Sequence, residues 1–167
     1  DFLIEMATRE LHSNFIGIDF TKSGVESLLT KVKTYQLGNI RVVYGDARSK
    51  LSALFRDEEL ETVYVNFPDP WPRKRHLKRR LFNPEFVNLL AQKLGSGGHV
   101  YLATDSESYA QQMMEYFDAE PSCQNMNQPS GFLDSRKGLP KTKYEKSFIY
   151  AGEKTYYLEY SRLLIAG

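Results

Sequence analysis

Four short apolar runs alternate with helical patterns along the chain, and an aspartate lies at or just after the end of each run. The runs are NFIGIDF (14–20), IRVVYGD (40–46), ETVYVNF (61–67) and GGHVYLATD (97–105). Continuous apolar runs of this length are typical of strands buried on both faces. Their alternation with helices implies right-handed βαβ units. We therefore predict an α/β fold with a doubly wound, mostly parallel sheet.

Local signals place helices between these strands. Residues 1–11 have apolar side chains at helical spacing, and Ser23 begins an S-x-x-E capping box that predicts a helix ending near Gly38. A short helix is expected around residues 51–55. Asn83 followed by Pro84 predicts a further helix start, and another helix should follow Asp105.

The C-terminal third contains a long polar stretch and then two β-rich runs. Residues 127–145 are rich in turn formers, so we expect a long loop there. Residues 146–151 and 155–164 are joined by a glycine-containing turn and predict a C-terminal antiparallel hairpin. The length of 167 residues fits a single domain over 1–167.

Aspartates follow the four predicted strands, at Asp19, Asp46, Asp69 and Asp105. The carboxyl ends of parallel strands share one edge of a sheet, where ligands bind in such folds. Aspartate after a strand is also a common turn former or helix cap, and Asp105 directly precedes a predicted helix. Four acids at one edge favour a site. The first two would accept hydrogen bonds from a ribose diol and an adenine amine, which favours an adenosine-type cofactor.

The third strand leads into VNFPDPWPRKRHLKRR at residues 65–80. A proline on each side of Asp69 restricts its backbone and removes two amide donors, as expected for a preorganised carboxylate. Trp71 offers a flat apolar face on which a base or cofactor could stack. The alternative is a rigid loop with a tryptophan buried in the core. The pattern favours function over that alternative.

Six of the eight residues at positions 73–80 are Lys or Arg, and none is acidic. We call these residues the basic segment. The rest of the chain carries 16 Lys and Arg against 21 acids, so the overall charge of +1 conceals a local positive patch. Arginine and lysine bind phosphate oxygens and release counterions, which predicts binding to a polyanion backbone. A solvated loop is the alternative reading of such a run.

Several classes of function are disfavoured. One cysteine, Cys123, excludes an internal disulfide framework, and no histidine or base lies near it in sequence. The three histidines lack metal-ligand spacing, so we expect no metal site. No apolar run is long enough to span a membrane and no secretion signal opens the sequence. We expect no membrane partner and a cytoplasmic location.

Several motifs together resemble the bacterial tRNA (guanine-N7-)-methyltransferases. These motifs are GIDF, GDAR, FPDPWPRKRHLKRR, YLATDSESY and TKYE, and the resemblance extends from residue 2 to about 162. It implies a Rossmann-like class I methyltransferase that uses S-adenosylmethionine as cofactor. It also implies tRNA as partner and methylation of a variable-loop guanosine at position 46. The assembly expected is a monomer or homodimer.

The resemblance also assigns roles to individual residues. It implies that Asp19 holds the cofactor ribose, that Asp46 lies near the adenosine, and that Asp69 is the catalytic position beside the cofactor. The implied substrate-binding residues are Arg73, Asp105, Thr142, Lys143, Tyr144 and Glu145. The implied RNA-contacting residues are Arg75, His76, Leu77, Lys78, Arg79 and Arg80.

The implied chemistry needs alignment more than proton transfer. Guanine N7 carries an in-plane lone pair and no proton, so methyl transfer at that atom needs no obligatory general base. The protein must align N7 with the methyl donor and exclude water. Carboxylates can accept hydrogen bonds from guanine N1–H and the 2-amino group, which discriminates against adenine. We therefore expect Asp69 and Glu145 to orient the base.

The family's glycine-rich motif, roughly E-x-G-x-G-x-G, is not found in the sequence, and we expect the chain to start after it and after the first strand. Two other functions stay open at this stage. A non-catalytic RNA-binding relative would keep the basic segment and lose methyl transfer. A class I methyltransferase of proteins or small molecules would have little use for a phosphate-binding segment.

Overall fold

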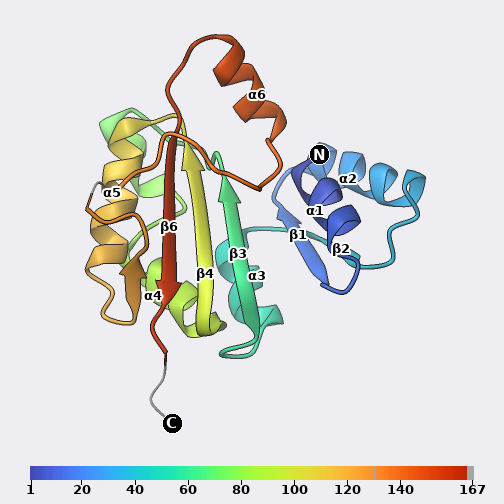
Figure 1. Ribbon diagram of the computed structural model, residues 1–167, viewed down its shortest axis with the longest axis horizontal. Coiled ribbons are helices and arrows are strands. Elements are labelled where there is room, and N and C mark those ends of the chain that lie inside the picture. Colours follow the sequence, from blue (N-terminus) through green and yellow to red (C-terminus); the bar gives the residue numbers. More distant parts are fainter. Residues whose placement is uncertain (130, 165–167) are drawn as a thin grey trace. The chain divides into compact units, whose positions relative to one another are not determined.

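The computed structural model describes residues 1–129 and 131–164 (Figure 1). The chain divides into two compact units. The first unit comprises residues 1–54 and 138–143, and the second comprises residues 55–137 and 144–167. Each unit is described separately below.

The first unit contains a parallel two-stranded sheet with helices packed on it. Its elements are α1 (Phe2–Arg9), β1 (Phe15–Asp19), α2 (Lys22–Thr34), β2 (Ile40–Tyr44) and α3 (Ala47–Leu54). A small core forms around Ile4, Ala7 and Ile40. Gly17 of β1 permits close helix packing, since a Cβ there would lie 2.7 Å from the side chain of Leu3 and 2.9 Å from that of Leu28.

The second unit contains a four-stranded mixed sheet in the order β3-β4-β6-β5. β3 pairs with β4 in parallel, and β6 pairs antiparallel with both β4 and β5. Figure 1 shows α6 beyond the carboxyl ends of β3 and β4. The elements are β3 (Leu60–Asn66), the 3₁₀ helix η1 (Lys74–Arg79), α4 (Pro84–Lys93), β4 (Leu94–Thr104), α5 (Glu107–Asp118), β5 (Cys123–Asn125), α6 (Lys143–Tyr150) and β6 (Tyr156–Arg162).

Aromatic rings fill much of the core of the second unit. The ring of Phe82 lies 5.3 Å from that of Phe86 and 5.8 Å from that of Phe117. Phe117 in turn stacks on Tyr160 at 4.7 Å, which joins α5 to β6. Aromatic side chains bury large apolar areas, so this cluster is a major source of the unit's stability. The helices that carry this cluster, α4 and α5, both pack against β4.

Most predicted strands and helices are confirmed, with corrections at some ends. The four strands lie where the apolar runs predicted them, and Asn83 caps α4 by accepting a hydrogen bond from Phe86 N at 2.7 Å. The capping box at Ser23 is wrong. Thr21 is the N-cap of α2, and its hydroxyl accepts from Gly24 N at 3.2 Å. α4 ends at Lys93, and β4 begins directly after it at Leu94.

The partner in the predicted C-terminal hairpin is also corrected. Residues 146–151 do not form a strand, since Lys143–Tyr150 is helix α6. Glu145 is buried and Phe148 is half-buried, at a spacing of three that suits a helix, whereas Tyr150 is 96% exposed. An antiparallel pair does end the sheet, but β6 pairs with β5 instead. The predicted loop is confirmed over the described residues 127–129 and 131–142, and residues 143–145 belong to α6 instead.

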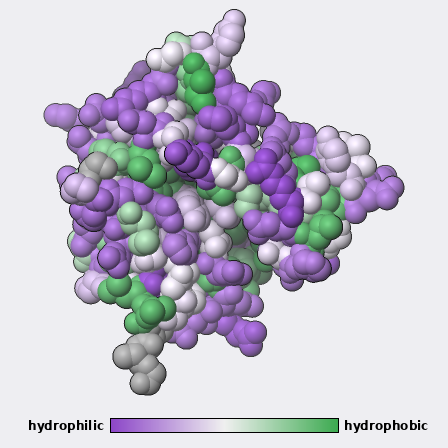
Figure 2. All heavy atoms as spheres, in the orientation of Figure 1, coloured by the Kyte–Doolittle hydropathy of each residue, from purple (hydrophilic) through white to green (hydrophobic). Residues whose placement is uncertain are grey.

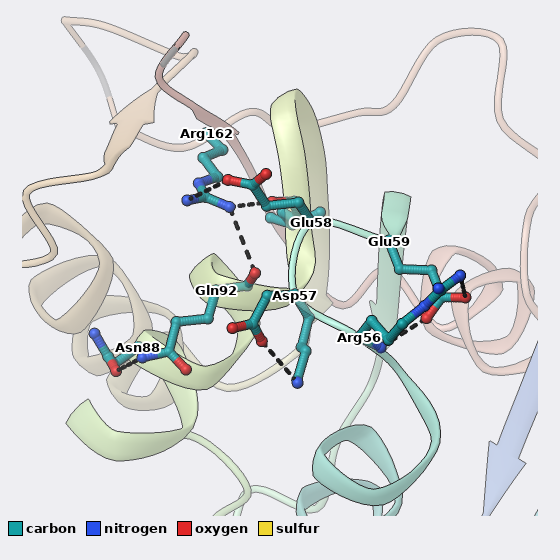
Figure 3. A network of polar contacts seen from close by, with 9 residues as sticks. Arg56, Asp57, Glu58, Glu59, Asn88, Gln92 and Arg162 are labelled. Atoms are coloured by element: carbon teal, nitrogen blue, oxygen red, sulfur yellow. Dashed lines mark hydrogen bonds and ion pairs between the residues drawn. The ribbon is translucent and has the colours of Figure 1, made fainter. Parts of the chain in front are cut away.

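Paired charges surround the amino ends of β3 and β4 (Figure 3). Lys93 donates to Asp57 at 2.9 Å, and Arg162 lies 3.5 Å from Glu58. Arg56 lies 3.9 Å from Glu59. The guanidinium of Arg162 also donates to the carbonyl oxygen of Leu94 at the start of β4. Each of these three acids is therefore paired with a cation.

The face of the molecule seen in Figure 2 is mostly hydrophilic, with hydrophobic residues in small separate patches, one of them over α6. Within the described ranges, no helix has both the length and the hydropathy required to cross a lipid bilayer.

Candidate active site and nucleic-acid interface

Asp19 ends β1 and lies against the first turn of α2. Its Oδ1 accepts hydrogen bonds from Thr21 N at 2.8 Å and from the Thr21 hydroxyl at 2.7 Å. A Cβ added to Gly24 would lie 2.1 Å from Asp19 Oδ2, so the glycine leaves the space that this carboxylate needs. The amide dipoles at a helix N-terminus favour a negative charge there. Asp19 is therefore held as an oriented acceptor.

Asp46 follows β2 and is held by Arg48. The Arg48 side chain donates to Asp46 Oδ1 at 3.2 Å and to Oδ2 at 2.9 Å, and its backbone amide donates at 2.8 Å. These side-chain hydrogen bonds lower the pKa of Asp46 from its ordinary value. The carboxylate is ionised at neutral pH. Because β1 and β2 are parallel neighbours, Asp19 and Asp46 lie at the same edge of the first unit's sheet.

The segment around Asp69 has a strained backbone. Phe67 has φ 52° and Trp71 has φ 41°, so two bulky residues on either side of Pro68-Asp69-Pro70 adopt the left-handed region. Such conformations cost about 1–3 kcal/mol each and persist only where surrounding contacts impose them. We call residues 67–71 the strained turn. Strain of this kind is concentrated at functional sites.

Contacts on both sides impose this conformation. Phe67 N donates to the carbonyl oxygen of Ala103 at 2.8 Å, and the Phe67 ring lies 5.4 Å from that of Phe148 in α6. The Trp71 ring lies 5.0 Å from the guanidinium of Arg79 and 5.7 Å from the His76 ring. One face of the Trp71 ring therefore packs against Arg79 of η1.

The acids Asp69 and Asp105 follow two neighbouring parallel strands, β3 and β4. Asp69 is exposed and Asp105 is half-buried. Within residues 1–129 and 131–164, neither carboxylate makes a hydrogen bond or an ion pair. Asp105 is not the cap of α5, because Ser106 accepts the hydrogen bond from Tyr109 N at 3.3 Å. Both acids therefore remain available to a ligand.

Five of the six cations of the basic segment are exposed, together with Leu77, and His76 is half-buried. η1 presents these cations close in sequence to the strained turn. The exposed cations are Arg73, Lys74, Arg75, Lys78 and Arg79. An exposed arginine can bind phosphate oxygens at little desolvation cost, so this part of the segment suits a nucleic-acid backbone.

Arg80, the last residue of the basic segment, differs from the other five cations because it is only 4% exposed. Its Nε donates to the carbonyl oxygen of Pro70 at 2.6 Å. Its two terminal nitrogens donate to Gln112 at 3.1 Å and to Ser108 at 3.2 Å, both on α5. The guanidinium also lies 4.6 Å from the ring centre of Tyr109. Among the described residues, Arg80 is held only by groups of the second unit.

Glu145 is 2% exposed and forms a buried ion pair with Arg136. Glu145 accepts hydrogen bonds from Tyr157 at 2.6 Å and from Arg136 at 3.2 Å. Arg136 also donates to Asn66 at the end of β3 at 2.9 Å, so the pair adjoins the same edge as Asp69. Sequence reasoning did not single out Arg136, because one arginine in a polar loop carries no pattern.

The remaining predicted substrate residues lie around the start of α6. Thr142 is buried, and Lys143 and Tyr144 are exposed. The Tyr144 ring lies 6.5 Å from that of Phe67, which places it beside the strained turn. The structure thus assembles Asp69, Tyr144 and Glu145 around one edge of the second unit's sheet.

His99 and Cys123, two residues of chemically reactive types, have surroundings that suit a structural role. His99 shares a hydrogen bond of 3.0 Å with Glu159 on the neighbouring strand. Burial raises the pKa of the Cys123 thiol to about 11, which disfavours a nucleophilic thiolate. No group of three potential metal ligands occurs among the residues that the structure describes.

Two methyltransferases from bacteria are similar in sequence to most of this chain. A tRNA (guanine-N(7)-)-methyltransferase of Alkalilimnicola ehrlichii is 39% identical over 96% of this chain and 67% of its own length. Another, from Idiomarina loihiensis, is 40% identical over 86% of this chain. The chain covers 59% of that relative.

Solved structures support the same fold. The precorrin-6y C5,15-methyltransferase of Geobacter metallireducens superposes with a TM-score of 0.61. It shares 12% identity over 95% of this chain and 73% of its own, so it supports the fold alone. A family model described as a putative methyltransferase matches residues 1–158. The chain therefore belongs to this methyltransferase family, together with the curated tRNA (guanine-N(7)-)-methyltransferases.

Proposed function

We propose that the protein transfers a methyl group from S-adenosylmethionine to N7 of a guanosine in tRNA, the variable-loop guanosine at position 46. One observation carries the proposal. Relatives named for this reaction share 39% and 40% identity with the chain, and the identity extends over most of it. The exposed basic segment beside an unpaired carboxylate is what such a reaction requires.

The acids of the first unit fit the cofactor. Asp19 and Asp46 present oxygen acceptors at one sheet edge, which suits a ribose diol and an adenine amine. Gly24 leaves the space that the Asp19 carboxylate itself occupies, so the carboxylate keeps its orientation. When bound, the cofactor supplies an electrophilic methyl group on a sulfonium. Asp19 would hold the ribose and Asp46 would lie beside the adenosine.

Asp69 would orient the reacting groups. The strained turn fixes its backbone, and its carboxylate has no partner within the described part of the chain. A carboxylate at this point can accept hydrogen bonds from a guanine edge and favour the positive sulfonium side of the cofactor. Because N7 has no proton to lose, positioning is the main requirement. Asp69 therefore serves as a catalytic residue through alignment and charge.

The exposed cations would bind the tRNA backbone. Arg75, Lys78 and Arg79 project from η1, and Arg73 precedes them beside the strained turn. Contacts to phosphate position an RNA without reading its sequence. We propose that His76 and Leu77 lie within the same interface. Binding of the backbone at η1 would then deliver the base towards Asp69.

The residues around α6 would complete the substrate site. Asp105, Thr142, Lys143 and Tyr144 are proposed to contact the substrate. Glu145 is also assigned here, but its burial means that a direct hydrogen bond to a base requires the segment around Arg136 to move. An ionised carboxylate has about four acceptor positions, so Glu145 can take a further donor once exposed. We propose a cytoplasmic location, and either a monomer or a homodimer.

A methylation assay tests the proposal directly. The protein is incubated with tRNA and isotope-labelled S-adenosylmethionine, and the label is mapped to a base and atom. We expect label at guanine N7 at position 46, and strongly reduced rates for Asp69→Ala and Asp69→Asn. Tight tRNA binding without label would instead indicate a non-catalytic RNA-binding protein. Label on a protein or small molecule alone would contradict the proposed substrate.

A further inference from the structure

Arg80 belongs to the basic segment by sequence but not by environment. Five neighbouring cations are exposed, whereas Arg80 is 4% exposed and its hydrogen bonds run to Pro70, Ser108 and Gln112. A guanidinium that is buried in this way has no surface to offer to a phosphate. Removing a charge from water is costly, so its position must be compensated by these contacts. The contacts therefore indicate a role inside the protein.

We propose that Arg80 is a positioning residue for Asp69 and not a tRNA contact. This inference rests on the proposed function. The carbonyl that Arg80 holds at 2.6 Å belongs to Pro70, the residue next to Asp69. Its other hydrogen bonds run to α5, which packs against β4 and β6. Arg80 thus joins the strained turn to α5, a helix packed on the second unit's sheet.

The guanidinium is well suited to this role. Its planar fork donates in three directions while one face lies 4.6 Å from the Tyr109 ring centre. The hydroxyl of Tyr109 accepts from Phe82 N at 3.1 Å, which fixes the ring. No uncharged side chain can make the three donations and the ring contact together. Loss of the guanidinium should leave the Pro70 carbonyl unheld and allow Asp69 to move.

The two roles predict different measurements. A tRNA contact at Arg80 would raise the salt dependence of binding, by about 0.7–0.9 in the logarithmic slope for each phosphate bound. A positioning residue would leave that slope unchanged and lower the turnover number. Misplacing a reacting group by about 1 Å can cost about 10²-fold in rate. The fluorescence of Trp71 reports directly on the strained turn, because Trp71 is the chain's one tryptophan and belongs to that turn.

The experiment compares Arg80→Gln with Arg75→Gln, the same chemical change at a buried and an exposed arginine. For Arg80→Gln we expect turnover to fall about 10²-fold. Its tRNA salt slope should equal that of the wild type, and Trp71 should become more accessible to acrylamide quenching. For Arg75→Gln we expect the salt slope to fall by about 0.7–0.9 and the quenching of Trp71 to be unchanged.

A second variant protects against a folding failure. Ser108→Ala combined with Gln112→Ala retains Arg80 and removes two of its acceptors. Turnover should fall less than in Arg80→Gln, with increased quenching of Trp71 and an unchanged salt slope. A reduced salt slope with normal turnover and normal quenching in Arg80→Gln would overturn the inference. If the wild type methylates no tRNA, the proposed function fails, and the quenching of Trp71 still decides whether Arg80 holds the turn.

Discussion

Charged residues lie at both ends of β3 and β4, but their pairing differs between the two ends. At the amino ends, Asp57 pairs with Lys93 and Glu58 with Arg162, as Figure 3 shows for the surrounding network. At the carboxyl ends, the carboxylates of Asp69 and Asp105 have no hydrogen bond or ion pair within the described ranges. Acids that are paired hold the fold together, whereas acids left unpaired beside strained backbone indicate a ligand site.

At each end an arginine donates a hydrogen bond to a backbone carbonyl, but the two arginines differ in whether they also pair with an acid. Arg162 donates to the carbonyl of Leu94 and also lies 3.5 Å from Glu58. Arg80 donates to the carbonyl of Pro70 and makes no ion pair within the residues that the structure describes. An arginine without a carboxylate keeps its positive charge near Asp69 uncompensated. At both ends an arginine holds a backbone carbonyl, but within the described residues only Arg162 also has an acid partner.

The largest effect is expected at Asp69, and Asp57 at the opposite end of the sheet is its control. Asp69→Asn should lower the rate of N7 methylation by about 10²-fold or more, with little change in stability, because an exposed and unpaired group contributes little to folding. Asp57→Asn should leave methylation unchanged and lower the free energy of unfolding by about 1 kcal/mol, since the buried Lys93 loses the negative charge that compensates it. Kinetics and urea unfolding measure both. Equal effects of Asp69→Asn and Asp57→Asn on the methylation rate would contradict the assignment of different roles to the two ends.

A smaller effect is expected at Tyr157, which tests the buried pair beside the carboxyl ends. Burial raises the pKa of the Tyr157 hydroxyl, so it remains a protonated donor to Glu145 at 2.6 Å over the usual pH range. Tyr157→Phe should lower the free energy of unfolding by about 1–2 kcal/mol, the value of a hydrogen bond to a charged group. Thermal unfolding measures this loss. A stability equal to that of the wild type would show that Arg136 alone sustains Glu145.

The smallest effect concerns Asp46, an acid at a carboxyl edge that is nevertheless paired. Its folded-state pKa lies below the ordinary value of 3.8, so the ionised form stabilises the fold above about pH 4. That contribution is lost as the pH falls through the folded-state pKa. Arg48→Ala should therefore reduce stability by under about 0.5 kcal/mol at pH 7, because the pair is exposed.

Unfolding at two pH values checks the Asp46 prediction. The difference between Arg48→Ala and the wild type should be present at pH 7 and should shrink in strong acid. A difference that persists below the folded-state pKa would assign the effect of Arg48 to packing. If Arg48→Ala also alters cofactor affinity, the Asp46–Arg48 pair belongs to the cofactor site. A paired acid would then also take part in ligand binding.

Local patterns predicted the elements well where burial follows a simple period. The strands ending near Asp19 and Asp46 are confirmed, as is the start of α4 at Asn83. They failed at residues 146–151, where Phe148, Ile149 and Tyr150 suggested a strand. The structure forms a helix there because Glu145 and Phe148 face inward three residues apart. A pattern based on apolar residues cannot predict that a glutamate such as Glu145 is buried.

The sequence by itself determined the α/β class, the acids at the strand ends and the presence of a basic segment, because periodicity and composition record which faces are buried. Only the tertiary structure decided that Arg80 differs from its neighbours and that Arg136 meets Glu145. Arg80 finds Ser108 and Gln112 at separations of 28 and 32 residues, and Arg136 finds Asn66 at 70. Burial of a charge depends on such distant partners, and no local pattern contains them.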